Sequence, residues 1–198
     1  RGTRADKGYL PYFKALTEAG YNVVSIDYRK HLAKGIDTKG LKGAVITMKN
    51  AVEYAADMGA CILQNSWGYV SDEQLSDSMY SKHFSVELEA FRYFQTCKNS
   101  PAIDGGVVIF AAGNSALPFA EYPAGYSEFI AVSATAPDGL PTTYTNYGPG
   151  CNVSAPGGEG SVINYQWRDE GCVLSTIPAD CPDYATNGQT TYGEDYGY

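Results

Sequence analysis

The sequence has few basic residues and no long hydrophobic run. Its 198 residues include 14 Lys and Arg against 22 Asp and Glu, which gives a net charge of −8 at pH 7. Phosphate binding needs clustered Lys and Arg, so this balance argues against nucleic acid as a partner. No segment approaches the roughly 18 uninterrupted apolar residues of a membrane span, so we expect none. Arg1 opens the chain without a signal-peptide pattern, and any targeting segment is expected upstream.

Cysteine is also scarce, and its spacing argues against a zinc site. The five cysteines form no C-x-x-C pair and have no histidine at metal-ligand spacing. Cys61 and Cys151 lie in apolar, strand-like runs and are predicted to be buried thiols. Cys172 and Cys181 could form a disulfide across a loop, which the sequence alone leaves open.

The length and composition predict one globular domain over residues 1–198. With 44% hydrophobic residues, a chain of this size can bury one sizeable core. Tyrosine and glycine are most frequent after Tyr184, so residues 184–198 are expected to be extended and exposed.

Apolar residues recur at helical spacing in some segments and form short continuous runs in others. Helices are predicted at residues 8–19, from Leu41 to a stop at Gly59, and at 86–94, where Leu88, Phe91 and Phe94 face inward. Strands are predicted at residues 21–27, 60–65, 106–112, 129–135, 151–155 and 173–177. This alternation predicts a three-layer α/β fold, with a mostly parallel sheet and helices on both faces.

Two candidate ligand-binding segments each follow a predicted strand. Ser66-Trp67-Gly68 comes after one strand, and Gly113-Asn114 comes after the next. Ligands of parallel sheets bind beyond the carboxyl ends of the strands, so both segments are expected at one edge of a cleft. The amide of Asn114 can donate a hydrogen bond to the negative oxygen that develops during acyl transfer. By itself, a Gly-Asn pair is common in ordinary strand-to-loop turns, and these residues alone favour such a turn.

Further motifs surround these segments in a fixed order. They are Ala111-Ala112-Gly113-Asn114, Tyr122-Pro123-Ala124, Thr145-Asn146-Tyr147-Gly148, Ser154-Ala155-Pro156-Gly157-Gly158 and Val173-Leu174-Ser175-Thr176-Ile177-Pro178. With Asn65-Ser66-Trp67-Gly68, this series resembles the subtilisin-like serine peptidases over roughly residues 52–178. The amino-acid sequences of residues 144–151 and 155–159 resemble the corresponding segments of subtilases from Bacteroides-type bacteria.

The resemblance implies roles for the matching residues. Asn114 takes the oxyanion-hole role. Ser66, Trp67 and Gly68 take the place of the strand that pairs with substrate backbone and lines the main specificity pocket, and Ala111, Ala112 and Gly113 form its other wall. Trp67 stands where the family often has a smaller residue, so it either reshapes the pocket or belongs to the core. Tyr122-Pro123 matches a position where the proline bond is cis in the family.

The catalytic motifs of that family are missing from this sequence. Neither His-Gly-Thr-His nor Gly-Thr-Ser-Met-Ala is present, although Arg1-Gly2-Thr3-Arg4 has a similar frame to the first. We therefore expect a central fragment of a serine endopeptidase, inactive alone, that acts on peptide or protein substrates. A non-catalytic peptide-binding module is the alternative. His31 and His83 are expected at the surface, His83 in a polar loop.

The first fifty residues resemble a different family. Residues 20–29 and 40–44 are similar to an α/β-hydrolase segment, so residues 1–50 are either divergent or foreign to the domain. The Gly-x-Ser-x-Gly elbow of α/β-hydrolases is absent, which makes that reading of the whole chain the weaker one.

The sequence identifies no cofactor. Calcium is left open because many subtilases bind it, and Asp104, Asp138 and Glu159 are acidic residues in predicted loops. The resemblance implies a secreted, periplasmic or cell-surface location.

Overall fold

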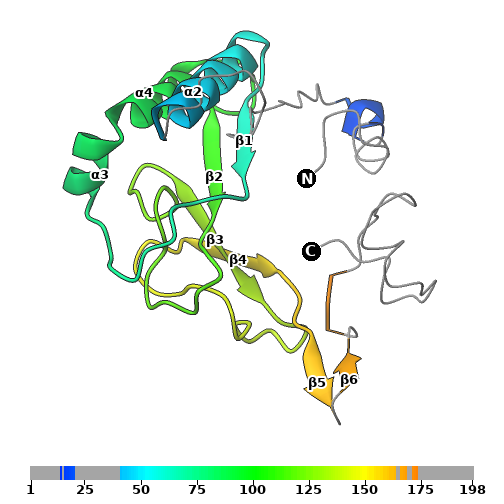
Figure 1. Cartoon of the computed structure of the whole chain (residues 1–198). Helices are drawn as coiled ribbons and strands as arrows, with labels where there is room; N and C mark the ends of the chain where they lie inside the picture. The colour runs from blue at the N-terminus through cyan, green and yellow to red at the C-terminus, as the bar shows by residue number, and fades with distance from the viewer. Residues whose placement is uncertain (1–13, 15, 21–40, 164–165, 169–170, 174–198) are drawn as a thin grey trace, which may run out of the picture.

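Parallel strands form the centre of the molecule (Figure 1). The structure is a computed structural model that describes residues 14, 16–20, 41–163, 166–168 and 171–173. One sheet has the order β1-β2-β3-β4, with all neighbours parallel. Its strands are β1 (Ile62–Asn65), β2 (Val107–Ala111), β3 (Ile130–Thr135) and β4 (Val153–Pro156). A separate antiparallel pair joins β5 (Ser161–Ile163) to β6 (Gln166–Arg168).

Two long helices pack side by side over one face of this sheet. They are α2 (Leu41–Asp57) and α4 (Ser85–Thr96), and α4 also contacts β2 (Figure 1). The short helix α3 (Asp77–His83) directly precedes α4. Helix α2 ends before Gly59, whose φ of 92° lies in the left-handed region that favours glycine. The predicted helix from Leu41 and its stop at Gly59 are confirmed.

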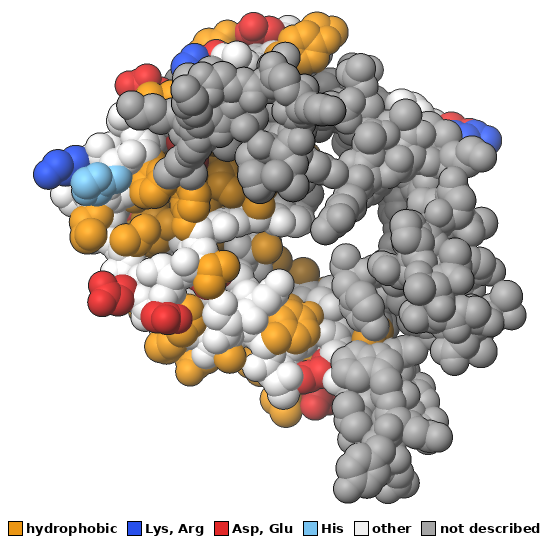
Figure 2. Space-filling view, viewed as in Figure 1, with side chains coloured by type: hydrophobic (Ala, Val, Ile, Leu, Met, Phe, Trp, Pro, Cys, Tyr) orange, Lys and Arg blue, Asp and Glu red, His pale blue; other side chains and the backbone are white. Residues whose placement is uncertain are grey.

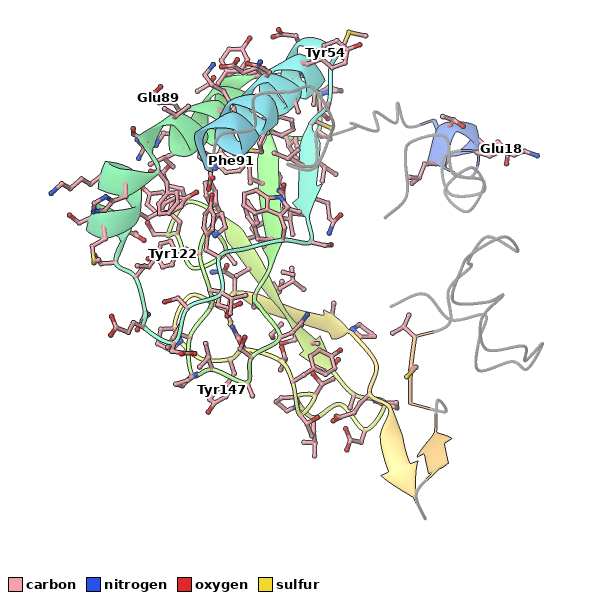
Figure 3. The ribbon with its side chains drawn as sticks, viewed as in Figure 1. Glu18, Tyr54, Glu89, Phe91, Tyr122 and Tyr147 are labelled. Carbon is pink, nitrogen blue, oxygen red and sulfur yellow. The ribbon has the colours of Figure 1, made fainter. Side chains whose placement is uncertain are left out.

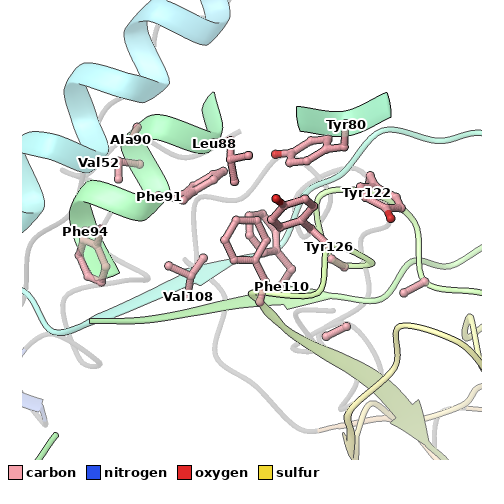
Figure 4. Close-up of a cluster of buried hydrophobic side chains, with 14 of the residues drawn as sticks. Val52, Tyr80, Leu88, Ala90, Phe91, Phe94, Val108, Phe110, Tyr122 and Tyr126 are labelled. Atoms are coloured by element: carbon pink, nitrogen blue, oxygen red, sulfur yellow. The ribbon is translucent and has the colours of Figure 1, made fainter. Parts of the chain in front are cut away.

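Aromatic side chains fill the space between α4 and the sheet (Figure 4). Phe91 and Phe94 of α4 and Phe110 of β2 are fully buried, and Phe91 meets Phe110 edge to face with ring centroids 5.4 Å apart. Helix and strand approach closely at Gly106, where any Cβ would overlap the Phe94 ring. Leu88, Phe91 and Phe94 therefore face inward as the periodicity predicted.

The described residues confirm the α/β class with its parallel sheet. They supply the sheet and one helical layer of the predicted three-layer arrangement. The second face of the sheet receives no helix from the described part of the chain, and Ile62 there is 54% exposed. No helix among the described residues is both long and apolar enough to cross a membrane.

Several expectations need correction. His83 is the last residue of helix α3 and does not lie in a loop. The helix begins after Ser76, whose Oγ accepts a hydrogen bond from Met79 N. It is exposed, as expected, and is the pale blue side chain of Figure 2. Cys61 and Cys151 are half-buried and not fully buried, since each lies beside a strand end. The β5–β6 pair was not predicted.

Some predictions fall on residues that the structure does not describe. They include the strand at 21–27, most of the helix at 8–19, His31, Cys181, the end at 184–198 and all of the strand at 173–177 except Val173. In the predicted helix at residues 8–19, the described residues Lys14 and 16–18 are helical, and Gly20 after it has a φ of 90°.

Candidate functional site

The two predicted ligand-binding segments meet at one edge of the sheet. Asn65 at the end of β1 is in register with Phe110, one residue before the end of β2. Since β1 and β2 are parallel neighbours, the chain leaves both strands at the same edge. We call residues 65–69 the first arm and residues 111–115 the second arm. The expectation that these segments lie together is confirmed.

Asn65 ties the first arm to β2. Its side chain is buried, and its Nδ2 donates to the Ile109 carbonyl at 3.1 Å and to the Leu63 carbonyl at 3.3 Å. Its Oδ1 accepts a hydrogen bond from the indole Nε1 of Trp67 at 3.2 Å. One amide therefore fixes both the strand end and the direction of the Trp67 ring.

Trp67 belongs partly to the core and partly to the surface. Its ring meets Phe110 edge to face at 5.4 Å between centroids and lies 6.4 Å from Phe91, yet 36% of the residue is exposed. The expectation that Trp67 belongs to the core therefore holds for one side of its ring, while its effect on a specificity pocket stays a prediction. Ser66 and Gly68, on either side of it, are exposed.

A buried carboxyl group supports the end of the first arm. Glu87 of α4 is fully buried and accepts hydrogen bonds from the hydroxyls of Tyr69, at 2.6 Å, and Tyr80. Burial raises the pKa of Glu87, and the two hydrogen bonds oppose that rise. Burial and the neighbouring Glu87 also raise the pKa of both tyrosines, so both hydroxyls stay protonated. The hydrogen bond to Glu87 therefore anchors Tyr69, the last residue of the first arm, to helix α4.

Asn146 holds the second arm from behind. It is fully buried; its Oδ1 accepts from the backbone N–H of Ser115 and of Leu117, both at 3.0 Å. Its Nδ2 donates to the Ala112 carbonyl at 3.1 Å, and its own backbone N–H donates to the Gly113 carbonyl at 3.0 Å. Four hydrogen bonds from one residue thus span the loop that carries Asn114.

Gly113 allows this close approach. Its φ is 116°, and a Cβ at this position would overlap both Asn146 Nδ2 and Glu121 Oε2. Ala112, predicted as part of a pocket wall, is 1% exposed and its carbonyl accepts from Glu121 N and Asn146 Nδ2. Ala111 is exposed at the end of β2.

Asn114 differs from the residues around it. Its side chain is exposed and makes no hydrogen bond to another described residue. Ala112 and Gly113 before it and Ser115 after it are all pinned through Asn146. The backbone on both sides of Asn114 is therefore held in place, and its exposed amide has no intramolecular acceptor in the described part of the chain.

Residues Glu121 and Tyr122 join the two arms. Glu121 N donates to the Ala112 carbonyl at 2.9 Å, and the Tyr122 carbonyl accepts from Tyr69 N at 2.7 Å. The Tyr122 side chain lies on the α3 side of the strands (Figure 3), where its ring is 5.2 Å from that of Tyr80, and its bond to Pro123 is cis, as the resemblance implied. The surface between residues 69–75 and 119–122 has only a slight depression, too small to hold a water molecule, and Glu121 is among its lining residues.

The acidic residues considered for calcium each have a partner in the protein. Asp104 pairs with Lys98 at 2.7 Å, Asp138 Oδ1 accepts from Leu140 N, and Glu159 Oε1 accepts from Thr143 N. Within the described ranges, no group of three acidic, histidine or cysteine side chains is arranged to hold a metal ion. These residues therefore do not form one common cation site.

Sequence reasoning did not assign a role to Asn146, Glu121 or Glu87. Asn146 was part of a quoted motif, but its reach back to the second arm depends on the tertiary fold. Glu121 does carry a signal, since it stands in the apolar stretch Phe119-Ala120-Glu121-Tyr122-Pro123-Ala124, where a charge must be buried or face a ligand. Glu87 has the same signal inside an amphipathic helix, next to Leu88.

Comparison with known proteins agrees with this geometry. Residues 30–193 match a sequence model described as the Subtilase family. Halolysin of Haloferax mediterranei is 33% identical over 115 residues, which are 58% of this chain and 19% of halolysin. Thermitase of Thermoactinomyces vulgaris is 30% identical over 123 residues, which are 62% of this chain and 37% of thermitase.

A solved structure supports the fold. The crystal structure of a lanthipeptide protease aligns with a TM-score of 0.53, covering 71% of this chain and 41% of that protein at 19% identity. This chain thus spans well under half the length of each of these three relatives. The family match includes residues 30–50, which the sequence analysis had set apart. Because that match covers most of the chain, the protein belongs to the subtilase family.

Proposed function

We propose that this chain is the substrate-binding and oxyanion-stabilising part of a serine endopeptidase. In this proposal, peptide bonds are hydrolysed through an acyl-enzyme. The chain supplies Asn114 and the two arms, while the catalytic Asp, His and Ser come from polypeptide outside this sequence. The 198 residues alone are then inactive.

The exposed amide of Asn114, carried on a loop that Asn146 holds and without an acceptor among the described residues, carries this proposal. When a serine attacks a carbonyl carbon, the carbonyl oxygen becomes negative, and a donor already in position stabilises it without reorganisation. Four hydrogen bonds of Asn146 hold the loop around Asn114, so the backbone that carries the donor does not have to be ordered during the reaction.

The first arm supports the binding of an extended peptide. Ser66, Trp67 and Gly68 are exposed, and their backbone groups make no hydrogen bonds to the backbone of other described residues. Such free N–H and C=O groups can pair with a substrate strand. Gly68 lies close to the Tyr122 carbonyl, because a Cβ added to Gly68 would be 3.2 Å from the Tyr122 oxygen. The first arm therefore has little room for a side chain at position 68.

The test is Asn114→Ala in the gene product that contains this chain together with the flanking sequence. We expect kcat to fall by about 10²–10³, the loss that removal of the oxyanion-hole asparagine causes in subtilisin, with little change in KM. Asn50→Ala, an exposed asparagine on α2, is the control and should leave kcat unchanged. An equal kcat for Asn114→Ala and the control would contradict the role of Asn114.

A second measurement separates the enzyme from a non-catalytic peptide-binding module. A fluorophosphonate probe should label the longer gene product at one serine and leave the 198-residue chain unlabelled. Stoichiometric labelling of the short chain would refute the proposal that its nucleophile lies elsewhere. Peptide binding without labelling of either protein would favour the module. For the parent protein we also propose a secreted, periplasmic or cell-surface location.

A further inference from the structure

Asparagine is followed by serine at Asn65-Ser66, Asn99-Ser100 and Asn114-Ser115. Such a pair can deamidate, a reaction that contributes to the thermal lability of asparagine. The serine backbone nitrogen attacks Cγ of the asparagine, so that an N–Cγ bond forms and the Cγ–Nδ2 bond breaks. The proton of the serine N–H leaves with the amide as ammonia, and water opens the resulting imide to aspartate or isoaspartate. The reaction therefore needs a side-chain amide that can turn and a serine nitrogen that can approach it.

In two of the pairs the side-chain amide is held. Asn65 is buried, and its Nδ2 donates to two backbone carbonyls, at 3.1 and 3.3 Å. Asn99 Nδ2 also donates to two backbone carbonyls, at 2.7 and 3.0 Å. Neither amide can turn toward the serine that follows it without breaking these hydrogen bonds. The folded structure thus opposes deamidation of both pairs at the side chain.

The third pair has the opposite arrangement. The side chain of Asn114 is exposed and bonds to no other described residue. The nitrogen of the serine is held instead, because Ser115 N donates to Asn146 Oδ1 at 3.0 Å. The N–H groups of the next two residues also donate to backbone or side-chain oxygens, at 2.9 and 3.0 Å. An asparagine whose amide stays free is here restrained at the nitrogen that would attack it.

Formation of the imide would disrupt the hydrogen bonds of Asn146. The Ser115 nitrogen would have to lose its proton and turn toward Asn114 Cγ, away from Asn146 Oδ1. Asn146 also fixes the backbone before Asn114, since its Nδ2 donates to the Ala112 carbonyl at 3.1 Å and its N–H to the Gly113 carbonyl at 3.0 Å. Asn146 is fully buried, so water does not readily replace these partners.

We propose that Asn114-Ser115 is a self-deamidation site and that Asn146 keeps it closed in the folded protein. Conversion would replace the donor amide of Asn114 by a carboxylate, which only accepts hydrogen bonds. A negative charge would then stand where the proposed function needs a donor to a negative oxygen, and the converted site would be inactive. Only this consequence rests on the proposed function, because the reaction of the pair requires no substrate.

Mass spectrometry of the 198-residue chain tests the proposal, with the other two pairs as internal controls. The native chain and the chain unfolded in guanidinium chloride are incubated in mildly alkaline buffer, and peptides containing residues 65, 99 and 114 are quantified as amide or acid. In the unfolded chain all three pairs should convert at similar rates, because serine follows each asparagine. In the native chain Asn114 should convert at least about tenfold more slowly, the factor that one ordinary hydrogen bond supplies.

Substitution tests the role of Asn146. In folded Asn146→Ala, Asn114 should convert about tenfold faster than in the native wild type, while the other two pairs keep their wild-type rates. Asn146→Asp is the matched control, because aspartate keeps an oxygen that accepts from Ser115 N and loses the donor to the Ala112 carbonyl. It should leave Asn114 protected.

Equal conversion of Asn114 in the native and unfolded wild-type chains would overturn the proposal. An unchanged rate at Asn114 in folded Asn146→Ala would overturn the assignment to Asn146. If Asn146→Ala unfolds, all three pairs accelerate together and Asn146→Asp decides: protection supports the proposal, and accelerated conversion of Asn114 alone contradicts it.

Activity of the longer gene product separates this proposal from the proposed function. Activity should decline in step with the converted fraction of Asn114. Full activity after conversion would contradict the oxyanion role of Asn114 and leave the deamidation site intact.

Discussion

The two arms of the site are held in place by different forces. The first arm combines ring packing of Trp67 against Phe110 and Phe91 with hydrogen bonds made by two of its own residues, Asn65 and Tyr69. The second arm is held by directed hydrogen bonds from the buried side chain of Asn146. Packing can re-form after a substitution that conserves volume, but a hydrogen-bond set leaves buried groups without partners when one side chain is removed. Because one side chain from outside the second arm supplies several of its hydrogen bonds, the arm that carries Asn114 is the more sensitive to a single substitution.

Removal of Asn146 should have the largest effect on stability. Asn146→Ala deletes the side-chain partner of Ser115 N, Leu117 N and the Ala112 carbonyl. We expect the free energy of unfolding to fall by about 3 to 4 kcal/mol, measured by urea unfolding. The control is Asn99→Ala, whose exposed amide also donates to two carbonyls and should cost about 1 kcal/mol. Equal losses for both variants would mean that burial of Asn146 is unimportant.

A methyl group at Gly113 should have the next largest effect. Gly113→Ala combines a left-handed φ of 116° with overlap of Asn146 and Glu121, so we expect a loss of about 2 to 3 kcal/mol in unfolding free energy. Gly139→Ala is a matched control, because Gly139 has a φ of 80° but no atom within 4 Å of the added Cβ. It should cost about 1 kcal/mol. If the two variants lose the same amount, the close approach at Gly113 adds nothing.

The pH dependence of stability tests the support of the first arm. Burial raises the pKa of Glu87 above its ordinary 4.5, so the folded protein keeps this proton to a higher pH than the unfolded chain. The stability due to the neutral carboxyl is complete below about pH 4.5 and is lost as pH rises through the folded-state pKa. The slope is at most about 1.4 kcal/mol per pH unit for one proton.

Glu87→Gln should remove this dependence. The amide is neutral at every pH and offers one acceptor and one donor to the hydroxyls of Tyr69 and Tyr80. Compared with the wild type, we expect the same unfolding free energy at pH 4, within about 0.5 kcal/mol, and a higher value at pH 8. Urea unfolding at pH 4, 6 and 8 measures it, with Glu89→Gln on the same helix as control. Curves that run parallel for wild type and Glu87→Gln would show that Glu87 does not titrate within this range.

Periodicity and turn residues sufficed to predict the sheet and the long helices. The stripe that includes Met48, Val52 and Ala55 ends at Gly59 in both the sequence and the structure, because a helical period and a glycine stop are local signals. Helix α3 was missed because its residues are mostly polar and give no apolar stripe. Its start does carry a signal, Ser76 followed by Asp77, which is typical of a capped helix.

The site was predictable in its position but not in its supports. Asn114 and Ser66 to Gly68 each follow a recognisable strand, so their common edge follows from parallel topology. What holds them was not predictable, since Glu87 meets Tyr69 and Asn146 meets Ser115 across 18 and 31 residues of sequence. Such contacts depend on the packed arrangement of elements, which composition and period do not specify.

The long reach of Asn146 has a consequence for how the site forms during folding. Asn146 follows β3 in the chain, yet its side chain bonds to residues that lie 29 to 34 positions earlier, directly after β2. The loop around Asn114 can thus take its final shape only after β3 has paired with β2 and the chain beyond it has folded back. Contacts that close such long segments form slowly because of the entropy they require. In a refolding experiment, recovery of the site should therefore lag behind the appearance of helical signal from α2 and α4.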